Sequence, residues 1–273
     1  MKKEQLVSLI KERQSLLCVG LDTDINKIPG SILKSAKDPV FEFNKLIIDA
    51  TLSSTVAYKP NTAFYEAQGL KGWESLQKTV DYIGDKAFVI ADAKRGDIGN
   101  TSKMYAQAFF EQMKVHAVTV APYMGEDSVT PFLGYENKWV IVLGLTSNKG
   151  SEDFQQLTLA NNEKLYEQVI RKVASWGDEN QLMFVVGATK AEYIKEIRVI
   201  VPEHFLLIPG VGAQGGDLDA VCKYGITKDG GLLINASRSI LYASSGSDFE
   251  KAAAAEALTM KTAMLPHLKS VGL

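Results

Sequence analysis

The stretch Ala87-Phe88-Val89-Ile90-Ala91-Asp92-Ala93-Lys94-Arg95-Gly96-Asp97 joins an apolar run to a dense cluster of charges. The run 87–91 is typical of a buried strand in a parallel sheet. Side chains alternate along a strand, so the spacing predicts that Asp92 and Lys94 point to the same side. Asp97 follows a glycine, and it can fold back toward them or reach a neighbouring subunit. The alternative interpretation is a structural ion pair without a chemical role.

Further apolar runs of similar length occur on both sides of this one, with helical patterns between them. Together they predict eight strands, at residues 16–21, 55–59, 87–91, 115–120, 139–145, 182–186, 205–208 and 232–234. Regular alternation of strands and helices favours a parallel sheet, and eight such units predict a closed (β/α)8 TIM barrel. A doubly wound open sheet is the alternative. No linker or internal repeat marks a second domain, so we expect residues 1–273 to form a single domain.

Three helical patterns are clear enough to place. Asp38 is the expected N-cap of a helix that has Pro39 at its first position and Val40, Phe43 and Ile47 on one face. A second helix is expected to end at Gly177, with an apolar face formed by Leu165, Val169, Val173 and Trp176. Residues 2–13 predict an extra N-terminal helix across the base of the barrel.

Composition narrows the classes of function. The chain has 273 residues, of which 46% are hydrophobic and 23% charged, and its 30 Lys and Arg residues nearly balance its 32 Asp and Glu residues. Such a chain has no overall field that would recruit nucleic acid or an anionic membrane, so we expect small-molecule ligands. Cys18 and Cys222 are too few for a disulfide framework. The sequence shows no export signal and no apolar run long enough for a membrane span, and we expect a cytoplasmic protein.

Polar residues gather where the expected strands end. In a (β/α)8 barrel the loops after the strands form the active site. The candidates are Asp22 after the first strand, Lys59-Pro60-Asn61 after the second, Asp92 and Lys94 after the third, Thr146-Ser147-Asn148 after the fifth, Pro209-Gly210 after the seventh and Asn235-Ala236-Ser237-Arg238 after the eighth. Charges of alternating sign would then meet at one end of the barrel, from Lys59, Asp92, Lys94 and Asp97. Each charge there keeps its oppositely charged neighbour ionised.

The loops after the seventh and eighth strands predict a phosphate site. Residues 209–217 are rich in glycine and include Gln214 and Gly215, and the eighth strand is followed by Arg238. Backbone N–H groups of such loops bind phosphate in many barrels, and an arginine offers a planar fork to two phosphate oxygens. The GxGxxG pattern at 210–215 is a weak match to a dinucleotide fold because it lies in the seventh unit. A flexible loop with a surface arginine is the other alternative.

Other catalytic chemistries lack their residues. His116, His204 and His267 are not at metal-ligand spacing, so a packing or surface role is expected for each. We find no Gly-x-Ser-x-Gly elbow and no Cys/His pair. The chemistry is therefore expected to depend on lysine and aspartate.

The ordered set of these motifs resembles the orotidine 5'-monophosphate decarboxylase family, in particular its longer bacterial branch. The resemblance covers essentially the whole chain and rests on Asp22, Lys59-Pro60-Asn61, the block 92–101 that ends in Asn100-Thr101, the Gly-rich loop with Gln214, and Arg238. It implies cofactor-independent decarboxylation of orotidine 5'-monophosphate (OMP) to UMP in de novo pyrimidine biosynthesis, without a metal. It also implies a homodimer with shared active sites.

The resemblance assigns a role to each matching residue. Lys59, Asp92, Lys94 and Asp97 would form the catalytic tetrad, with Asp97 and Thr101 delivered across the dimer interface. The substrate-binding set would be Asp22, Asn61, Thr101, Thr146, Ser147, Pro209, Gln214, Gly215 and Arg238, with Thr146 or Ser147 at the pyrimidine edge and Gln214 and Arg238 at the phosphate. Lys149 departs from the family, which has a proline there, and this leaves open which of Thr146 and Ser147 reads the base.

The implied chemistry agrees with the charges. Loss of CO2 from C6 of the pyrimidine ring leaves a carbanion, and the Lys94 ammonium would stabilise it and then donate a proton, while Asp92 and Asp97 hold that ammonium in place. A related alternative is the Mg2+-dependent group of 3-keto-L-gulonate 6-phosphate decarboxylase and hexulose-phosphate synthase, which shares the D-x-K-x-x-D pattern. A nucleotide sensor that binds without turnover is an alternative from another class.

Overall fold

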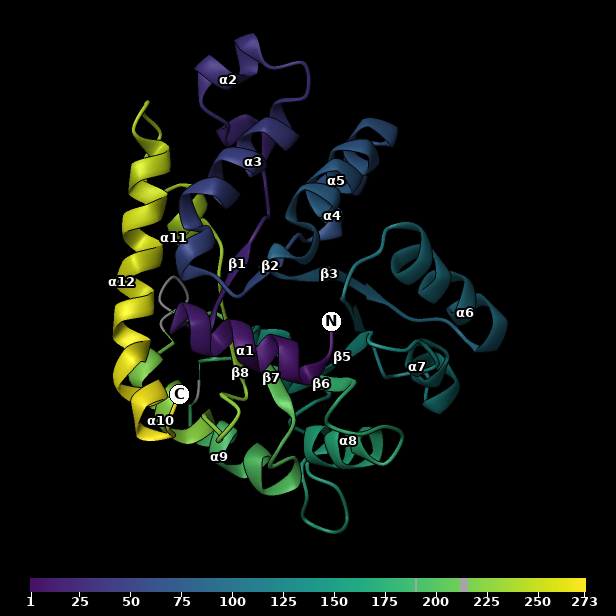
Figure 1. Ribbon diagram of the computed structural model, residues 1–273. Coiled ribbons are helices and arrows are strands. Elements are labelled where there is room, and N and C mark those ends of the chain that lie inside the picture. Colours follow the sequence, from purple (N-terminus) through teal and green to yellow (C-terminus); the bar gives the residue numbers. More distant parts are fainter. Residues whose placement is uncertain (190, 212–215) are drawn as a thin grey trace.

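Eight parallel strands close into a barrel in the computed structural model, which describes residues 1–189, 191–211 and 216–273 (Figure 1). The strands follow one another around the barrel in sequence order: β1 (Leu17–Gly20), β2 (Ala57–Lys59), β3 (Phe88–Arg95), β4 (Ala117–Val120), β5 (Trp139–Leu145), β6 (Leu182–Val186), β7 (Phe205–Pro209) and β8 (Leu232–Ala236). β1 pairs with β8 and closes the ring. The predicted (β/α)8 barrel is confirmed.

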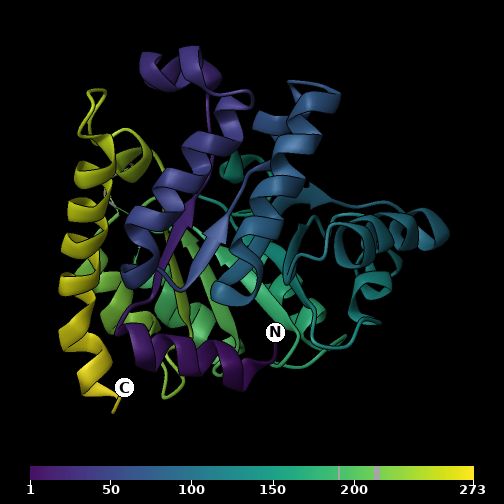
Figure 2. The ribbon, with the colours of Figure 1, turned by 45° about the horizontal axis from the view of Figure 1, so that its top comes forward.

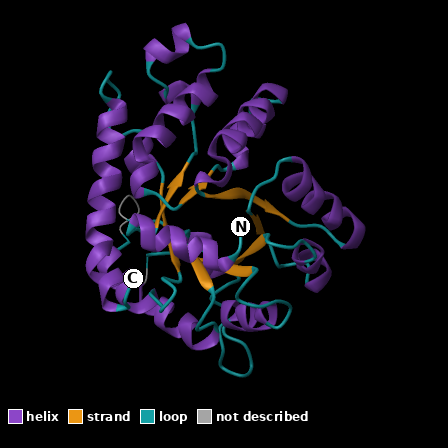
Figure 3. Cartoon of the chain, in the orientation of Figure 1, coloured by secondary structure: helices purple, strands orange, loops and turns teal. Residues whose placement is uncertain are grey.

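Helices form a ring around this barrel (Figure 3). The longer ones are α3 (Pro39–Thr51), α5 (Leu70–Ile83), α6 (Gly99–Gln107), α7 (Glu126–Leu133), α8 (Leu165–Ala174), α9 (Ala191–Ile200), α10 (Leu218–Gly225) and α12 (Phe249–Ser270). The shorter ones are α2 (Gly30–Ser35), α4 (Thr62–Glu66) and α11 (Arg238–Leu241). Short 3-10 helices lie at η1 (Ile25–Lys27), η2 (Leu52–Ser54), η3 (Gly84–Lys86) and η5 (Lys149–Asp153), and η4 (Ala108–Gln112) is a π-helical segment. None of the helices within the described ranges has the length and apolar character needed to cross a membrane.

The helix α1 (Lys3–Arg13) lies across the base of the barrel, as predicted (Figures 1 and 2). Leu6 and Ile10 on one of its faces are fully buried. The indole N–H of Trp139, at the start of β5, donates a hydrogen bond to the carbonyl of Met1 at 2.8 Å. The base is therefore closed, which leaves the carboxyl ends of the strands as the open end of the barrel.

The barrel core is apolar on both faces of the sheet. Apart from Lys94, Arg95, Leu143 and Pro209, every strand residue is buried, which explains why the strands appear in the sequence as continuous apolar runs instead of alternating ones. Near the base the Trp139 ring meets Phe88 and Phe205 edge-on, with centroid distances of 6.1 and 6.2 Å. This packed lower layer makes a rigid platform for the polar residues at the other end.

The local predictions have mixed outcomes. The α3 helix begins as expected, because the Asp38 carboxylate accepts a hydrogen bond from the N–H of Phe41 at 3.1 Å and Pro39 is the first helical residue. The α8 helix ends at Ala174 instead of Gly177, and its buried face is Tyr166, Ile170 and Val173. The predicted row is right in part, because Val173 is buried and Val169 and Trp176 are partly buried against the core, whereas Tyr166 and Ile170 on the adjacent row were missed.

Two of the three histidines lie just before strands, on the closed side of the barrel. The ring of His116 stacks on Phe88 at 5.6 Å, and its Nδ1 accepts a hydrogen bond from the N–H of Val89 at 3.0 Å. Burial lowers the pKa of His116 to about 4. The packing role expected for His116 is confirmed, and the residue belongs to the fold instead of the open end.

Candidate active site

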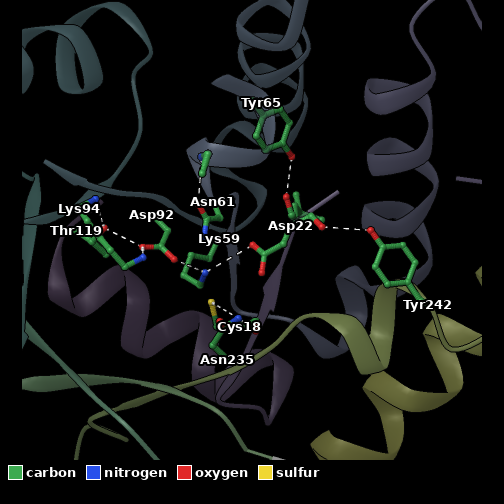
Figure 4. Close-up of polar contacts among 12 residues, drawn as sticks. Cys18, Asp22, Lys59, Asn61, Tyr65, Asp92, Lys94, Thr119, Asn235 and Tyr242 are labelled. Carbon is green, nitrogen blue, oxygen red and sulfur yellow. Dashed lines mark hydrogen bonds and ion pairs between the residues drawn. The ribbon is translucent and has the colours of Figure 1, made fainter. Parts of the chain in front are cut away.

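A row of alternating charges crosses the open end of the barrel (Figure 4). The ammonium of Lys59, at the end of β2, lies 2.7 Å from Asp92 Oδ2 and 3.9 Å from Asp22 Oδ1. The ammonium of Lys94 lies 2.6 Å from the other oxygen, Asp92 Oδ1. The order Asp22, Lys59, Asp92, Lys94 therefore places each anion beside a cation, with Asp92 at the centre of the array.

Burial and neighbouring charges act in opposite directions on the two central groups. Burial alone would lower the pKa of Lys59, but the carboxylates of Asp92 and Asp22 outweigh it and hold that pKa above its ordinary value. Burial alone would raise the pKa of Asp92, but Lys59 and Lys94 hold it well below its usual range. Both groups therefore stay ionised at neutral pH although they are nearly inaccessible to water.

An irregularity in β3 presents Asp92 and Lys94 to this array. The β3–β4 pairing shifts between Ala91 and Arg95, and Lys94 has a φ of +46°, in the left-handed region. β3 also continues to Arg95, whereas the apolar run predicted an end at Ala91. Asp92 and Lys94 do meet, but simple alternation is the wrong reason, because a regular strand would not contain the left-handed residue.

A cavity of about 370 Å³ opens beside the array. It is lined by residues from the ends of β1, β2, β3, β7 and β8: Asp22, Asp24, Lys27, Lys59, Asn61, Phe64, Asp92, Pro209, Gly210, Val211, Asn235, Ala236, Ser237, Arg238, Ser239 and Tyr242. Six of these carry a predicted catalytic or binding role, namely Asp22, Lys59, Asn61, Asp92, Pro209 and Arg238, and four more, Gly210, Asn235, Ala236 and Ser237, were candidates from their places after strands. The cavity is large enough for a nucleotide-sized ligand at its lower limit.

The expected phosphate end of this cavity lies between β7 and β8. Gly210 follows β7 with a φ of +95°, a conformation that favours glycine and turns the chain at the cavity wall. Arg238 starts α11 directly after β8 and is exposed at the same wall. Gln214 and Gly215, the other predicted residues of this loop, lie outside the described residues.

Asp97 and Thr101 do not line the cavity of their own chain. The Asp97 carboxylate accepts a hydrogen bond from the N–H of Ile98 at 2.7 Å, in the turn before α6, and Thr101 is exposed in the first turn of that helix. The side chain of Lys94 is itself 48% exposed, although it holds Asp92. The array of a single chain is thus open on the side of α6.

Thr146 and Ser147, at the end of β5, border a second and smaller cavity of about 80 Å³. The Thr146 hydroxyl donates to Asn148 Oδ1 at 2.6 Å, and its N–H donates to Gln155 Oε1 at 2.8 Å. Gly187, after β6, packs closely on Ser147, since an added Cβ would lie 2.8 Å from the Ser147 Cβ. Lys149, which stands where the resembling family has proline, begins the single turn η5.

Sequence reasoning missed several residues of the first cavity. The Tyr242 hydroxyl accepts a hydrogen bond from the N–H of Asp24 at 2.8 Å and donates one to the carbonyl of Asp22 at 3.2 Å, which fixes the backbone that follows the Asp22 side chain. The ammonium of Lys27 lies over the Tyr242 ring at 5.1 Å from its centroid. Tyr242 stands four residues after Arg238, one helical turn away, and that spacing was the available signal.

Asn235 and Cys18 form the floor below Lys59. The Asn235 amide donates to the carbonyl of Cys18 at 3.0 Å, between β8 and β1. Burial raises the pKa of Cys18 to about 12, so this residue is a thiol and not a reactive thiolate. Among residues 1–189, 191–211 and 216–273, no three His, Cys, Asp or Glu side chains form a group that could hold a metal ion.

Comparison with known proteins gives a consistent result. The family model "Orotidine 5'-phosphate decarboxylase / HUMPS family" matches residues 15–255. The orotidine 5'-phosphate decarboxylase of Flavobacterium johnsoniae is 58% identical, over 99% of this chain and 99% of that protein. The enzyme of the same name from Bacteroides fragilis strain YCH46 is 56% identical, over 99% of this chain and 100% of its own. The solved structure of Leishmania donovani OMP decarboxylase is 35% identical, with a TM-score of 0.80 over 96% of this chain and 100% of that one.

Proposed function

This chain belongs to the orotidine 5'-phosphate decarboxylase / HUMPS family, and we propose that it decarboxylates OMP to UMP with Lys94 as the proton donor. Relatives that are 56% and 58% identical over their full length carry the decarboxylase name, so the nucleotide substrate is favoured over the sugar-phosphate alternative. The observation that supports the mechanism is the row of charges Asp22, Lys59, Asp92 and Lys94, of which the first three line the cavity. We also propose that the chain acts as a single domain in the cytoplasm and that its reaction is part of pyrimidine biosynthesis.

Lys94 performs the central step. The bond between C6 and the carboxylate carbon breaks, CO2 leaves, and the electron pair stays on C6. The adjacent ammonium stabilises this charge and transfers one proton to C6, which gives UMP and a neutral amine that regains its proton from water. Asp92 holds the ammonium at 2.6 Å, and its lowered pKa keeps it an anion that cannot itself donate the proton.

Other residues of the two cavities bind the substrate in this proposal. Asp22 and Lys59 bind the ribose hydroxyls, Asn61 contacts the substrate from the wall of the same cavity, and Thr146 or Ser147, from the smaller cavity, contacts the pyrimidine edge. The phosphate is bound by Arg238, Pro209 and the loop with Gln214 and Gly215.

The experiment that tests this function follows the ultraviolet absorbance of OMP with purified protein. We expect OMP to be converted to UMP, and the rate to be the same in the presence of EDTA. Binding without turnover would support a nucleotide sensor, and loss of turnover in EDTA would support the Mg2+-dependent alternative.

Replacing Arg238 with alanine is expected to weaken UMP binding about 10- to 100-fold and to leave uridine binding unchanged, because the guanidinium contacts only the phosphate. Calorimetric titration of both ligands measures this difference. Arg171→Ala is the matched control, since Arg171 lies on α8 and pairs with Glu163 at 3.0 Å, away from the cavity. Equal losses for UMP and uridine would argue against a phosphate contact.

The proposal includes a second copy of the chain that completes the site. The open side of the array carries exposed apolar side chains: Ile98 (57%), Met104 (48%), Tyr105 (37%), Tyr123 (88%) and Met124 (48%). Ile98 directly precedes α6, Met104 and Tyr105 lie on it, and Tyr123 and Met124 lie in the segment before α7, which is the neighbour of α6 (Figure 1). An exposed apolar group of this kind is typical of a protein interface. A partner there would cover Lys94 and bring its own Asp97 and Thr101 to the array.

Mixing two inactive variants tests the shared site. In a hybrid of Asp97→Ala and Lys94→Ala subunits, one of the two sites combines an intact Lys94 with the intact Asp97 of the other subunit. Random exchange makes half of the dimers hybrids, so the mixture is expected to recover about a quarter of wild-type turnover. Each variant mixed only with itself is the control. Subunit exchange without any recovered turnover would contradict a site shared between subunits.

A further inference from the structure

At the irregularity between β3 and β4, the hydroxyl group of Thr119 bonds to two residues of β3. Thr119 lies in β4, is 1% exposed, and is the only polar residue in that strand. Its hydroxyl donates a hydrogen bond to Asp92 Oδ1 at 3.0 Å and accepts one from the backbone N–H of Lys94 at 2.9 Å (Figure 4). The two bonds fix its direction, because a carboxylate can only accept and a backbone amide can only donate.

The Thr119 hydroxyl restrains the irregular part of β3. The β3 residues Ala91 and Arg95 pair with Val118 and Val120 of β4, so four steps on one strand face two on the other. The extra length contains Asp92 and Lys94, and the φ of +46° at Lys94 is unfavourable for a residue with a side chain. A backbone conformation of this kind persists only where its surroundings hold it, and the bond from the Lys94 N–H to Thr119 is one such restraint.

The same hydroxyl completes the bonding of Asp92. One carboxylate oxygen accepts from Lys59 at 2.7 Å, and the other accepts from both Lys94 at 2.6 Å and Thr119 at 3.0 Å. Of these three donors, Thr119 is the only uncharged one, and a rigid strand holds it. Its bond therefore sets the rotation of the carboxylate, and through the carboxylate the place of the Lys94 ammonium.

We propose that Thr119 is a positioning residue for the decarboxylation step, one that holds the Asp92 carboxylate and the Lys94 backbone in the geometry needed for proton transfer. This inference rests on the proposed function and adds a residue to it. Thr119 does not line the cavity, so its effect on the reaction passes through Asp92 and Lys94. Displacing a catalytic group by about 1 Å costs on the order of 100-fold in rate.

The test compares three variants by steady-state kinetics and thermal unfolding. Thr119→Val keeps the shape and removes the hydroxyl, and we expect kcat to fall about 10- to 100-fold while KM stays within about twofold. Thr119→Ser restores the hydroxyl, and its kcat is expected within about threefold of wild type. Thr51→Val is the matched control, because the buried Thr51 hydroxyl bonds to the Ile47 carbonyl at 2.7 Å and to the Tyr58 hydroxyl at 2.9 Å, and neither of these groups belongs to the array. It is expected to lower Tm and leave kcat unchanged.

The outcomes separate this inference from the function on which it depends. An active wild type with an equally active Thr119→Val variant would overturn the inference alone, and so would a Thr119→Ser variant as slow as the valine variant. Wild-type protein without any turnover of OMP would overturn the proposed function and the inference together. If Thr119→Val does not fold, Thr119→Cys takes its place, since a thiol is a weak hydrogen-bonding group. Reduced kcat with unchanged KM then supports the inference, and wild-type kcat contradicts it.

Discussion

Replacing Lys94 with alanine is expected to lower kcat for OMP by at least about 10⁴-fold. The variant loses the proton donor, which contributes roughly 10²- to 10⁴-fold, together with the fixed charge beside C6, which contributes a further 10²- to 10³-fold. UMP binding is expected to change by less than about tenfold, because the phosphate and ribose contacts come from other residues. Single-turnover kinetics and a UMP titration measure the two effects separately.

A surface lysine provides the control for this substitution. Lys172 is exposed on α8, and Lys172→Ala removes the same charge without changing the array. Its kcat is expected to equal that of wild type. A Lys94→Ala variant with more than about a hundredth of wild-type turnover would remove Lys94 from the proton-donor role.

Replacing Asp92 with asparagine has the second largest expected effect, and it acts on stability as well as on turnover. The amide has nearly the same shape, but it leaves Lys59 buried with only Asp22, at 3.9 Å, as a counter-charge. Removing one partner of a buried ion pair costs about 3–5 kcal/mol in the free energy of unfolding. The released Lys94 ammonium also loses its fixed position, and kcat is expected to fall roughly 10³-fold.

The pH dependence of that stability loss has a definite sign. The folded-state pKa of Asp92 lies below its unfolded value, so its stabilising contribution is full above a pH of about 4 and is lost as the pH falls through the folded-state pKa. Denaturant unfolding of both proteins should therefore show a constant difference at neutral pH that narrows in strong acid. Asp49→Asn is the control, because the exposed Lys45–Asp49 pair, at 3.2 Å, contributes at most about 1 kcal/mol. An Asp92→Asn variant as stable as this control would contradict the described role of the array.

Much of the fold follows from the sequence because barrel strands are buried on both faces. Runs such as 139–145 and 182–186 therefore appear with the same bounds in the sequence and in β5 and β6. The row of apolar residues in α8 was ambiguous for a physical reason, since that helix carries apolar residues on two adjacent rows. Helix α2 was not predicted, because a six-residue helix is too short to show a period.

Some residues of the candidate site could be predicted from the sequence and others could not. Asp22, Lys59 and Asp92 were found because each directly follows or ends an apolar run, and Arg238 because it lies in the loop after the eighth run; barrel geometry brings these strand ends together. Thr119 and the left-handed conformation of Lys94 were not found, because the contacts of both depend on the register between β3 and β4. Asn235 and Cys18, for example, are 217 residues apart and meet only where β8 closes on β1. A pattern within one segment carries no information about such a meeting.

The most direct test of the central claim, that an ammonium group at position 94 makes the reaction possible, restores that group chemically. The Lys94→Cys variant treated with 2-bromoethylamine carries an ammonium on a side chain of nearly the original length. Cys18 and Cys222 are buried, and burial raises the pKa of each to about 12, so the new thiol reacts selectively, because the side chain at position 94 is 48% exposed in the single chain. We expect the untreated variant to be inactive, the aminoethylated protein to recover OMP turnover, and protein treated with iodoacetamide, which adds a neutral amide, to stay inactive. Equal turnover after both treatments, or none after aminoethylation of a correctly folded protein, would contradict the claim.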